Sequence, residues 1–212
     1  MKATKLLLVR HGATEWNLYK RAQGQADIPL TEKGRTQAVE TADALADFDI
    51  AAVYSSDLTR SIDTARVIAE KRGLDVVTDE RLREIDQGEW TGLSVDEIKK
   101  RWPDLWGPAR HYSTRPGGES PGDVRGRALQ AVERIVESHP DETVVVVSHG
   151  GTIRWLVAEA FGYDDRKSAR LRGMSNGGVV VLEGRVDDER GFDLCFLVRL
   201  DGASPDLDDP ND

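Results

Sequence analysis

The stretch Thr4-Lys5-Leu6-Leu7-Leu8-Val9-Arg10-His11-Gly12 decides the fold class of this chain. A short apolar run closed by a glycine is typical of a buried strand in a parallel sheet. In open α/β sheets, ligands bind in the crevice beyond the carboxyl ends of such strands. The first strand therefore carries a permanent cation, Arg10, and a titratable imidazole, His11, to the expected binding site.

A second stretch repeats this arrangement. Residues 144–147 are four consecutive valines, and Ser148-His149-Gly150-Gly151 follows them. A helical pattern starts at Thr152, and the free N–H groups of a helix N-terminus attract anions, which glycines allow to approach closely. A lone Arg-His pair is more simply explained as a polar strand end in solvent. Two of the four histidines standing at corresponding strand ends instead favour an anion site.

Predicted strands and helices alternate along the chain. We expect strands over residues 4–9, 51–54, 75–78, 144–147, 178–183 and 192–200, and helices over residues 32–48, 58–71, 94–101, 124–138 and 152–161. This alternation predicts an α/β fold with a mainly parallel, twisted sheet and helices on both faces. The last two strands are expected to join through a charged turn over residues 184–191. We expect one domain over residues 1–200, and a disordered acidic tail over residues 201–212.

Residues 94–119 interrupt this regular pattern. They contain two tryptophans, Trp102 and Trp106, and the polar residues Arg110, His111 and Arg115. Long irregular segments of this kind often form lids over active sites. The tryptophans can equally build a small core of their own. The sequence leaves both interpretations open.

The composition narrows the classes of function. The 212 residues carry a net charge of −9, with 39% hydrophobic and 32% charged residues, as is ordinary for a globular protein. The negative charge argues against general binding to nucleic acid or to anionic membranes. No stretch approaches the roughly 18 apolar residues of a membrane span. A single cysteine, Cys195, and an N-terminus without a signal pattern predict a cytoplasmic protein. No exposed apolar stripe indicates an oligomeric state.

Arg60 is a further candidate for the anion site. It follows Ser55-Ser56-Asp57, which we expect to cap the helix over residues 58–71. An arginine in the first turn opposes the helix dipole, although exposed side chains often tolerate this. The arrangement is favourable if Arg60 reaches over the strand ends and holds an anion together with Arg10, His11 and His149.

Glu84 is a candidate general acid. It lies between Leu82 and Ile85, whose burial would place its carboxyl group in partly apolar surroundings and raise its pKa. Spacing alone does not distinguish Glu84 from Asp86 or Glu89.

These motifs resemble the signature of the histidine phosphatase superfamily, which has the phosphoglycerate-mutase-like fold. The similar segments are residues 10–17 (Arg-His-Gly-Ala-Thr-Glu-Trp-Asn), 23–34, 55–60, 82–92 and 148–151. They occur in the family's order from Leu6 to about Gly151, which is far more specific than one Arg-His-Gly triplet.

The resemblance implies a role for each residue of the site. His11 is implied to be the nucleophile that forms a phosphohistidine, and Glu84 the proton donor. The phosphoryl oxygens would be held by Arg10, Arg60 and His149, helped by Asn17, Gln23, Gly24 and Gly150. We expect a neutral His11, held by a backbone carbonyl, and a charged His149. The arginines would supply the charge that Mg²⁺ supplies elsewhere, and no third ligand stands at metal spacing, so no metal or other cofactor is expected.

The resemblance is to the short bacterial phosphatases. Mutases of the family carry a glutamate directly after Arg-His-Gly, where this chain has Ala13. We therefore expect hydrolysis of a small phosphomonoester, such as a sugar phosphate or a phosphoglycerate derivative like glucosyl-3-phosphoglycerate. A phosphoglycerate mutase and a non-catalytic phosphate-binding module are the alternatives, the second disfavoured by the presence of Glu84. Candidates for the rest of the substrate are Arg110, His111 and Arg115 for a carboxylate, and Trp102 and Trp106 for stacking on a sugar.

Overall fold

A six-stranded sheet forms the centre of the computed structural model, which describes residues 3–106, 113–168, 171, 173–187 and 191–199. Its strand order is β3-β2-β4-β1-β5-β6. The strands are β1 (Ala3–Arg10), β2 (Ile50–Ser55), β3 (Val76–Thr78), β4 (Thr143–Ser148), β5 (Val179–Asp187) and β6 (Gly191–Arg199). The first four in chain order pair in parallel, and β5 and β6 add antiparallel strands beside β1. The predicted α/β fold with a mainly parallel sheet is confirmed.

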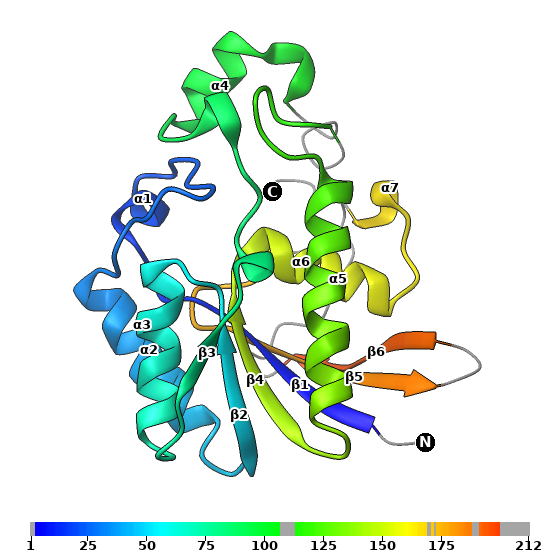
Figure 1. The fold of residues 1–212 in the computed structure, drawn as a ribbon. Helices are drawn as coiled ribbons and strands as arrows, with labels where there is room; N and C mark the ends of the chain where they lie inside the picture. Colours follow the sequence, from blue (N-terminus) through cyan, green and yellow to red (C-terminus); the bar gives the residue numbers. More distant parts are fainter. Residues whose placement is uncertain (1–2, 107–112, 169–170, 172, 188–190, 200–212) are drawn as a thin grey trace.

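Helices cover both faces of this sheet (Figure 1). One face carries α2 (Glu32–Ala44) and α3 (Thr59–Glu70), and the other carries α5 (Pro121–Ser138) and α6 (Gly150–Ala160). The shorter helices are α1 (Glu15–Leu18), α4 (Val95–Arg101) and α7 (Asp165–Ser168), together with the 3₁₀ helices η1 (Glu80–Leu82), η2 (Gly88–Trp90) and η3 (Pro103–Leu105). The described residues include no helix with the length and apolar character that a membrane span requires.

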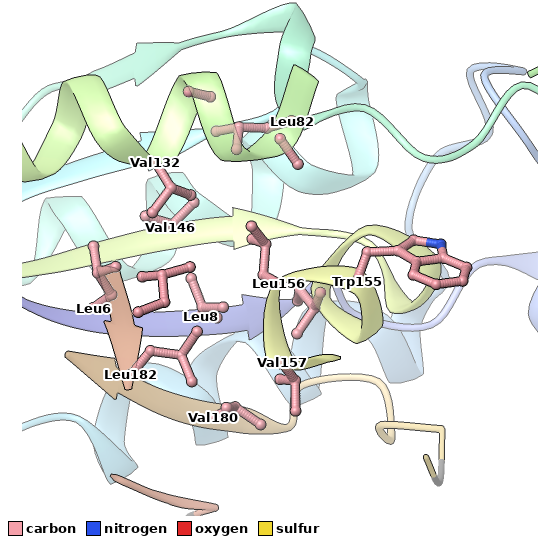
Figure 2. Close-up of a cluster of buried hydrophobic side chains, with 14 of the residues drawn as sticks. Leu6, Leu8, Leu82, Val132, Val146, Trp155, Leu156, Val157, Val180 and Leu182 are labelled. Carbon is pink, nitrogen blue, oxygen red and sulfur yellow. The ribbon is translucent and has the colours of Figure 1, made fainter. Parts of the chain in front are cut away.

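The continuous apolar run of β1 follows from its position between two helical layers. Leu6 and Leu8 belong to the core under α5 and α6, whereas Leu7 and Val9 belong to the core under α2 and α3. All four are fully buried. Figure 2 shows the first of these cores, with Leu6 and Leu8 gathered close to Val146 of β4. Successive strand residues point to opposite faces, so a strand covered on both sides must be apolar throughout.

Several element boundaries differ from the predicted ones. Helix α5 begins at Pro121, three residues before the predicted start, because Ser120 and Asp123 form a capping box and proline is favourable in the first turn. Helix α2 ends at Ala44 rather than at residue 48. Strand β5 extends to Asp187, so the predicted turn over residues 184–191 is too long.

The predicted cap of α3 is wrong. Leu58 is the N-cap residue, and its side chain makes no capping hydrogen bond. The carboxylate of Asp57 instead accepts a hydrogen bond from Nε of Arg83 at 2.7 Å. Asp57, which the local sequence predicts to cap the helix, is therefore paired with Arg83 from another part of the chain instead.

The described part of the segment over residues 94–119 forms α4 and η3, and its tryptophans pack against Trp90, which precedes the segment. The ring of Trp90 lies 6.2 Å from that of Trp102 and 6.0 Å from that of Trp106. Figure 1 places α4 apart from the sheet, at the end of the molecule where α5 begins. Residues 107–112, and with them Arg110 and His111, lie outside the described residues, as does the predicted tail over residues 201–212.

Candidate active site

His11 directly follows β1 and is almost fully buried, with 3% of its surface exposed. Its Nδ1 lies 2.7 Å from the backbone oxygen of Gly12, which can only accept a hydrogen bond. Nδ1 therefore carries the proton, and Nε2 keeps its lone pair. Burial lowers the pKa of His11 well below its usual value, and the positive charges of Arg60 and Arg10 lower it further. The predicted neutral imidazole is what this environment produces.

His149 occupies the equivalent position after β4. Its ring centroid lies 5.1 Å from that of His11, and Oγ of Ser61 lies 3.3 Å from its Nε2. Burial lowers the pKa of His149 well below its usual value, followed in size by the charge of Arg60. In the ligand-free protein His149 is therefore neutral, because an imidazolium here would be both desolvated and beside a cation. The expected positive charge of His149 concerns the site with a bound phosphoryl group and stays a prediction.

Arg60 lies in the first turn of α3, as predicted, and is 1% exposed. Its Nη1 donates to the carbonyl of Ala26 at 2.7 Å, and its Nη2 donates to the carbonyl of Gly24 at 2.8 Å. Burial lowers the pKa of Arg60 to about 10, which still leaves it protonated at neutral pH. A fixed cation thus lies beside both histidines.

Arg10 is the second fixed cation. Its Nη1 donates to the carbonyl of Met174, and a Cβ atom at Gly150 would lie 3.2 Å from its Nε. The Nε atoms of Arg10 and Arg60 and the Nδ1 atom of His149 are buried without a hydrogen-bond partner in the described part of the chain. Buried polar atoms without partners are rare in folded proteins. Their concentration around His11 fits a site that is completed by an anionic ligand with several oxygens.

Glu84 lies on an irregular segment between η1 and η2. The flanking Leu82 and Ile85 are buried, as expected. Oε2 of Glu84 accepts a hydrogen bond from the Gly151 N–H at 3.0 Å, and Oε1 accepts one from the Ile85 N–H at 2.9 Å. The negative charge of Glu84 also raises the pKa values of the two site arginines against the larger effect of burial, so its carboxylate lies near both.

Two other carboxylates were candidates for this position. Oδ1 of Asp86 accepts a hydrogen bond from the N–H of Gly88, and the Glu89 side chain lies next to Gly117. Of the three, Glu84 shares a pocket with Arg10. The structure thus places Glu84, and neither Asp86 nor Glu89, in the pocket with Arg10.

The four predicted substrate-binding residues lie around this site in different ways. The Asn17 Oδ1 accepts hydrogen bonds from the N–H and the hydroxyl of Thr14, and the Gln23 Oε1 accepts from the same hydroxyl. Their amide nitrogens are left as donors. Gly24 has a φ of +52° and positions its carbonyl on Arg60. Gly150 is the first residue of α6, where a backbone N–H has no acceptor within the helix.

Several residues that support the site were not among the predicted site residues. Ser61 contacts His149, Asn176 donates to the backbone oxygen of His11 at 3.0 Å, and the carbonyl of Met174 holds Arg10. The last two come from residues 173–178, which approach the site only because the loop before β5 folds back beside β1. Arg127, on α5, also contacts the segment of Glu84.

A pocket of about 950 Å³ opens over Arg10, Glu84 and Gly150. The buried residues His11, Arg60 and His149 do not line it. Its cationic lining residues are Arg10, Lys20, Arg21, Lys99, Arg115 and Arg154, and its carboxylates are Glu84 and Asp96. Trp90 and Trp106 also line it, and the guanidinium carbon of Arg115 lies 4.8 Å from the ring centroid of Trp90. In the part of the chain that the structure describes, no three His, Cys, Asp or Glu side chains are grouped as a metal site requires.

The fold and the site together define a class of α/β protein in which two strand-end histidines and two buried arginines lie at one edge of the sheet. The model of the histidine phosphatase superfamily (branch 1) matches residues 6–191, and the chain belongs to this superfamily. It is an enzyme, a phosphatase that uses a histidine nucleophile.

Relatives of this chain are similar over almost their whole length. The chain is 36% identical to glucosyl-3-phosphoglycerate phosphatase of Mycolicibacterium vanbaalenii, over 95% of this chain and 94% of that protein. It is 39% identical to the protein of the same name from Mycobacterium tuberculosis, over 87% of each chain. The solved native structure of a mycobacterial glucosyl-3-phosphoglycerate phosphatase matches with a TM-score of 0.85 at 36% identity, over 93% of this chain and 98% of the other.

Proposed function

We propose that this protein hydrolyses glucosyl-3-phosphoglycerate, or a closely similar phosphoglycerate derivative, through a phosphohistidine on His11. The observation that carries the proposal is the hydrogen bond between Nδ1 of His11 and the backbone oxygen of Gly12. It leaves a neutral Nε2 as a nucleophile next to two arginines, both of which also lie near Glu84. The similarity to two named glucosyl-3-phosphoglycerate phosphatases supports the choice of substrate.

In the first step, the lone pair of Nε2 of His11 attacks the phosphorus atom. The bond between phosphorus and the ester oxygen breaks, and its electron pair goes to that oxygen. Glu84, a carboxylate in the ligand-free site, takes up a proton when the phosphate dianion binds beside it. It gives this proton to the same oxygen, so that an alcohol leaves and Glu84 becomes a carboxylate again. The phosphoryl group is now bonded to His11.

In the second step, water enters where the alcohol has left. The Glu84 carboxylate takes a proton from this water while its oxygen attacks the phosphorus. The bond between phosphorus and nitrogen breaks, and its electron pair returns to Nε2 of His11. Inorganic phosphate leaves, and both residues are restored to their starting protonation states.

The remaining residues bind the charge on the phosphoryl oxygens. Arg10 and Arg60 stabilise it as fixed cations in a water-poor site, where such interactions are strong. The bound dianion raises the pKa of His149, which then donates a hydrogen bond that the ligand-free site lacks. The phosphoryl group is also surrounded by the side-chain amides of Asn17 and Gln23 and by the backbone of Gly24 and Gly150. We propose that these groups stabilise the charge on the phosphoryl oxygens without a metal ion.

The lining of the pocket supports a leaving group that is itself acidic. We assign Arg115 and Lys99 to a carboxylate of the substrate and the ring of Trp106 to a sugar face, since both kinds of residue line the pocket next to Glu84. Trp102, the other candidate, does not line this pocket.

A panel of phosphomonoesters, assayed with and without a chelator, tests this proposal. We expect the highest kcat/KM for glucosyl-3-phosphoglycerate, full activity with chelator, and none for His11→Ala. Interconversion of 2- and 3-phosphoglycerate faster than phosphate release would establish the mutase alternative. An intact fold with no turnover of any ester would establish the binding module. Loss of activity with chelator would exclude the metal-independent mechanism.

A further inference from the structure

The side chain of Arg127 on α5 connects the general-acid segment to the body of the protein. Its Nη1 donates to the carbonyl oxygens of Arg81 at 2.7 Å and of Arg83 at 2.6 Å, and its Nη2 donates to that of Glu84 at 2.9 Å. One guanidinium group therefore holds three backbone oxygens of the segment that carries Glu84. Arg127 itself is largely buried, with 17% of its side chain exposed.

Glu119 completes this arrangement from the other side. It accepts hydrogen bonds from Nε and Nη2 of Arg127, at 2.8 and 2.9 Å, which is the two-point pairing of a guanidinium with a carboxylate. Its Oε2 also accepts the N–H of Asp86 at 2.8 Å, and its backbone N–H donates to the carbonyl of Asp86. Burial raises the pKa of Glu119, but the hydrogen bonds from Arg127 and Asp86 outweigh burial and keep it ionised.

The segment that carries Glu84 is not held in place by regular secondary structure. Residues 84–87 belong to no helix or strand, so no backbone ladder fixes the direction of Glu84. On the side of β4 and α6, Oγ of Ser148 donates to the carbonyl of Leu82, and Oγ1 of Thr152 donates to that of Arg83. The backbone on both sides of Glu84 is thus fixed largely by side chains, and Arg127 supplies more of these side-chain hydrogen bonds than any other residue described.

We propose that Arg127, held by Glu119, is a positioning residue that fixes the carboxyl group of Glu84 where it can protonate the leaving oxygen. This inference rests on the proposed role of Glu84 as the general acid. Arg127 acts through the backbone of residues 81–86 and has no contact with the reacting atoms in this account. A displacement of about 1 Å at a catalytic group can reduce a rate by roughly 100-fold, so the rigidity of this segment has a direct effect on catalysis.

The test measures the activity of the Arg127→Met variant on two substrates. Their leaving groups differ in whether they must be protonated. An alkyl phosphate, 3-phosphoglycerate, requires protonation of its leaving oxygen, whereas p-nitrophenyl phosphate releases a stable anion without it. We expect kcat/KM for 3-phosphoglycerate to fall by roughly 10- to 100-fold, and that for p-nitrophenyl phosphate by less than about 3-fold. Arg127→Lys should recover part of the loss, since lysine can still donate to one or two of the carbonyl oxygens.

Arg125 provides a matched control on the same helix. It pairs with Glu159 on α6, at a side-chain exposure of 31%, so Arg125→Met removes another ion pair of α5. We expect this variant to keep the ratio of the two substrates. Glu119→Gln serves as a second test if Arg127→Met does not fold, and it should change the ratio in the same direction.

The same assay on Glu84→Gln separates the two proposals. If Glu84→Gln lowers kcat/KM equally for 3-phosphoglycerate and p-nitrophenyl phosphate, the general-acid role and the positioning role are both overturned. The positioning role alone is overturned by a different combination of results. In it, Glu84→Gln lowers kcat/KM mainly for 3-phosphoglycerate, whereas Arg127→Met and Glu119→Gln lower it equally for both substrates or not at all.

Discussion

The imidazole rings of His11 and His149 lie 5.1 Å apart, with their planes inclined by 61°. This pair exists because β1 and β4 are neighbours in parallel, with Arg10 opposite Ser148, so that the next residue of each strand reaches the same point. Two motifs more than a hundred positions apart thus become one site. Both rings are buried next to Arg60, and neither one favours a second proton in the ligand-free protein.

The low pKa values of these two histidines predict how stability changes with pH. An unfolded histidine takes up a proton below about pH 6.5, whereas the folded rings resist protonation, so the unfolded state binds more protons. The contribution of the two histidines to stability is therefore fully present above pH 6.5, and it is lost as the pH falls from 6.5 toward their lowered folded-state pKa values. Thermal unfolding at several pH values should show this loss, and His11→Gln combined with His149→Gln should make it smaller. An unchanged pH dependence in the double variant would contradict the pKa shifts.

Gly151→Ala should impair catalysis and leave the fold intact. A Cβ atom at this position would lie 2.3 Å from Oε1 of Glu84, so the carboxyl group has to move away. We expect kcat/KM for an alkyl phosphate to decrease by roughly 10- to 100-fold, with a small change in the melting temperature. Gly126→Ala is the control, because a Cβ there meets no atom within 4 Å. Equal activity of the two variants would show that the position of Glu84 is not limiting.

Arg60→Met should reduce stability as well as activity. The substitution removes the donors to the buried carbonyl oxygens of Gly24 and Ala26. An unsatisfied buried acceptor costs roughly 1–3 kcal/mol, so we expect a loss of about 3 kcal/mol in the free energy of unfolding, measured with urea. Arg66→Met on the same helix, which removes an exposed pair with Asp63, should change it by less than about 0.5 kcal/mol. A similar loss for both would mean that the buried contacts of Arg60 contribute little.

The sheet and the position of the two histidines could be predicted from the sequence because both depend on local patterns. Residues 6–9 and 144–147 are apolar at every position, a pattern that is typical of strands covered on both faces. A histidine and a glycine follow closely after each run. The helices with apolar spacing were predicted for the same reason. The short helices α1 and α7 have too few residues for such a pattern, and they were not predicted.

Other features depend on tertiary contacts and could not be predicted. The pairing of Asp57 with Arg83 overrides the expected helix cap, and the neutral state of His149 follows mainly from its complete burial, which no local pattern reveals. Asn176 reaches His11 across 165 positions of the chain. The cytoplasmic location and the state of residues 201–212 stay predictions.

The covalent role of His11 is the central claim, and trapping the phosphoenzyme tests it most directly. The Glu84→Gln variant, mixed with p-nitrophenyl phosphate, should still be phosphorylated because the leaving group needs no proton, and hydrolysis should be slow because the base is missing. Rapid quenching followed by peptide mass spectrometry at neutral or basic pH should locate one phosphoryl group on His11. A phosphoryl group on His149, or turnover without any phosphorylated histidine, would contradict the account.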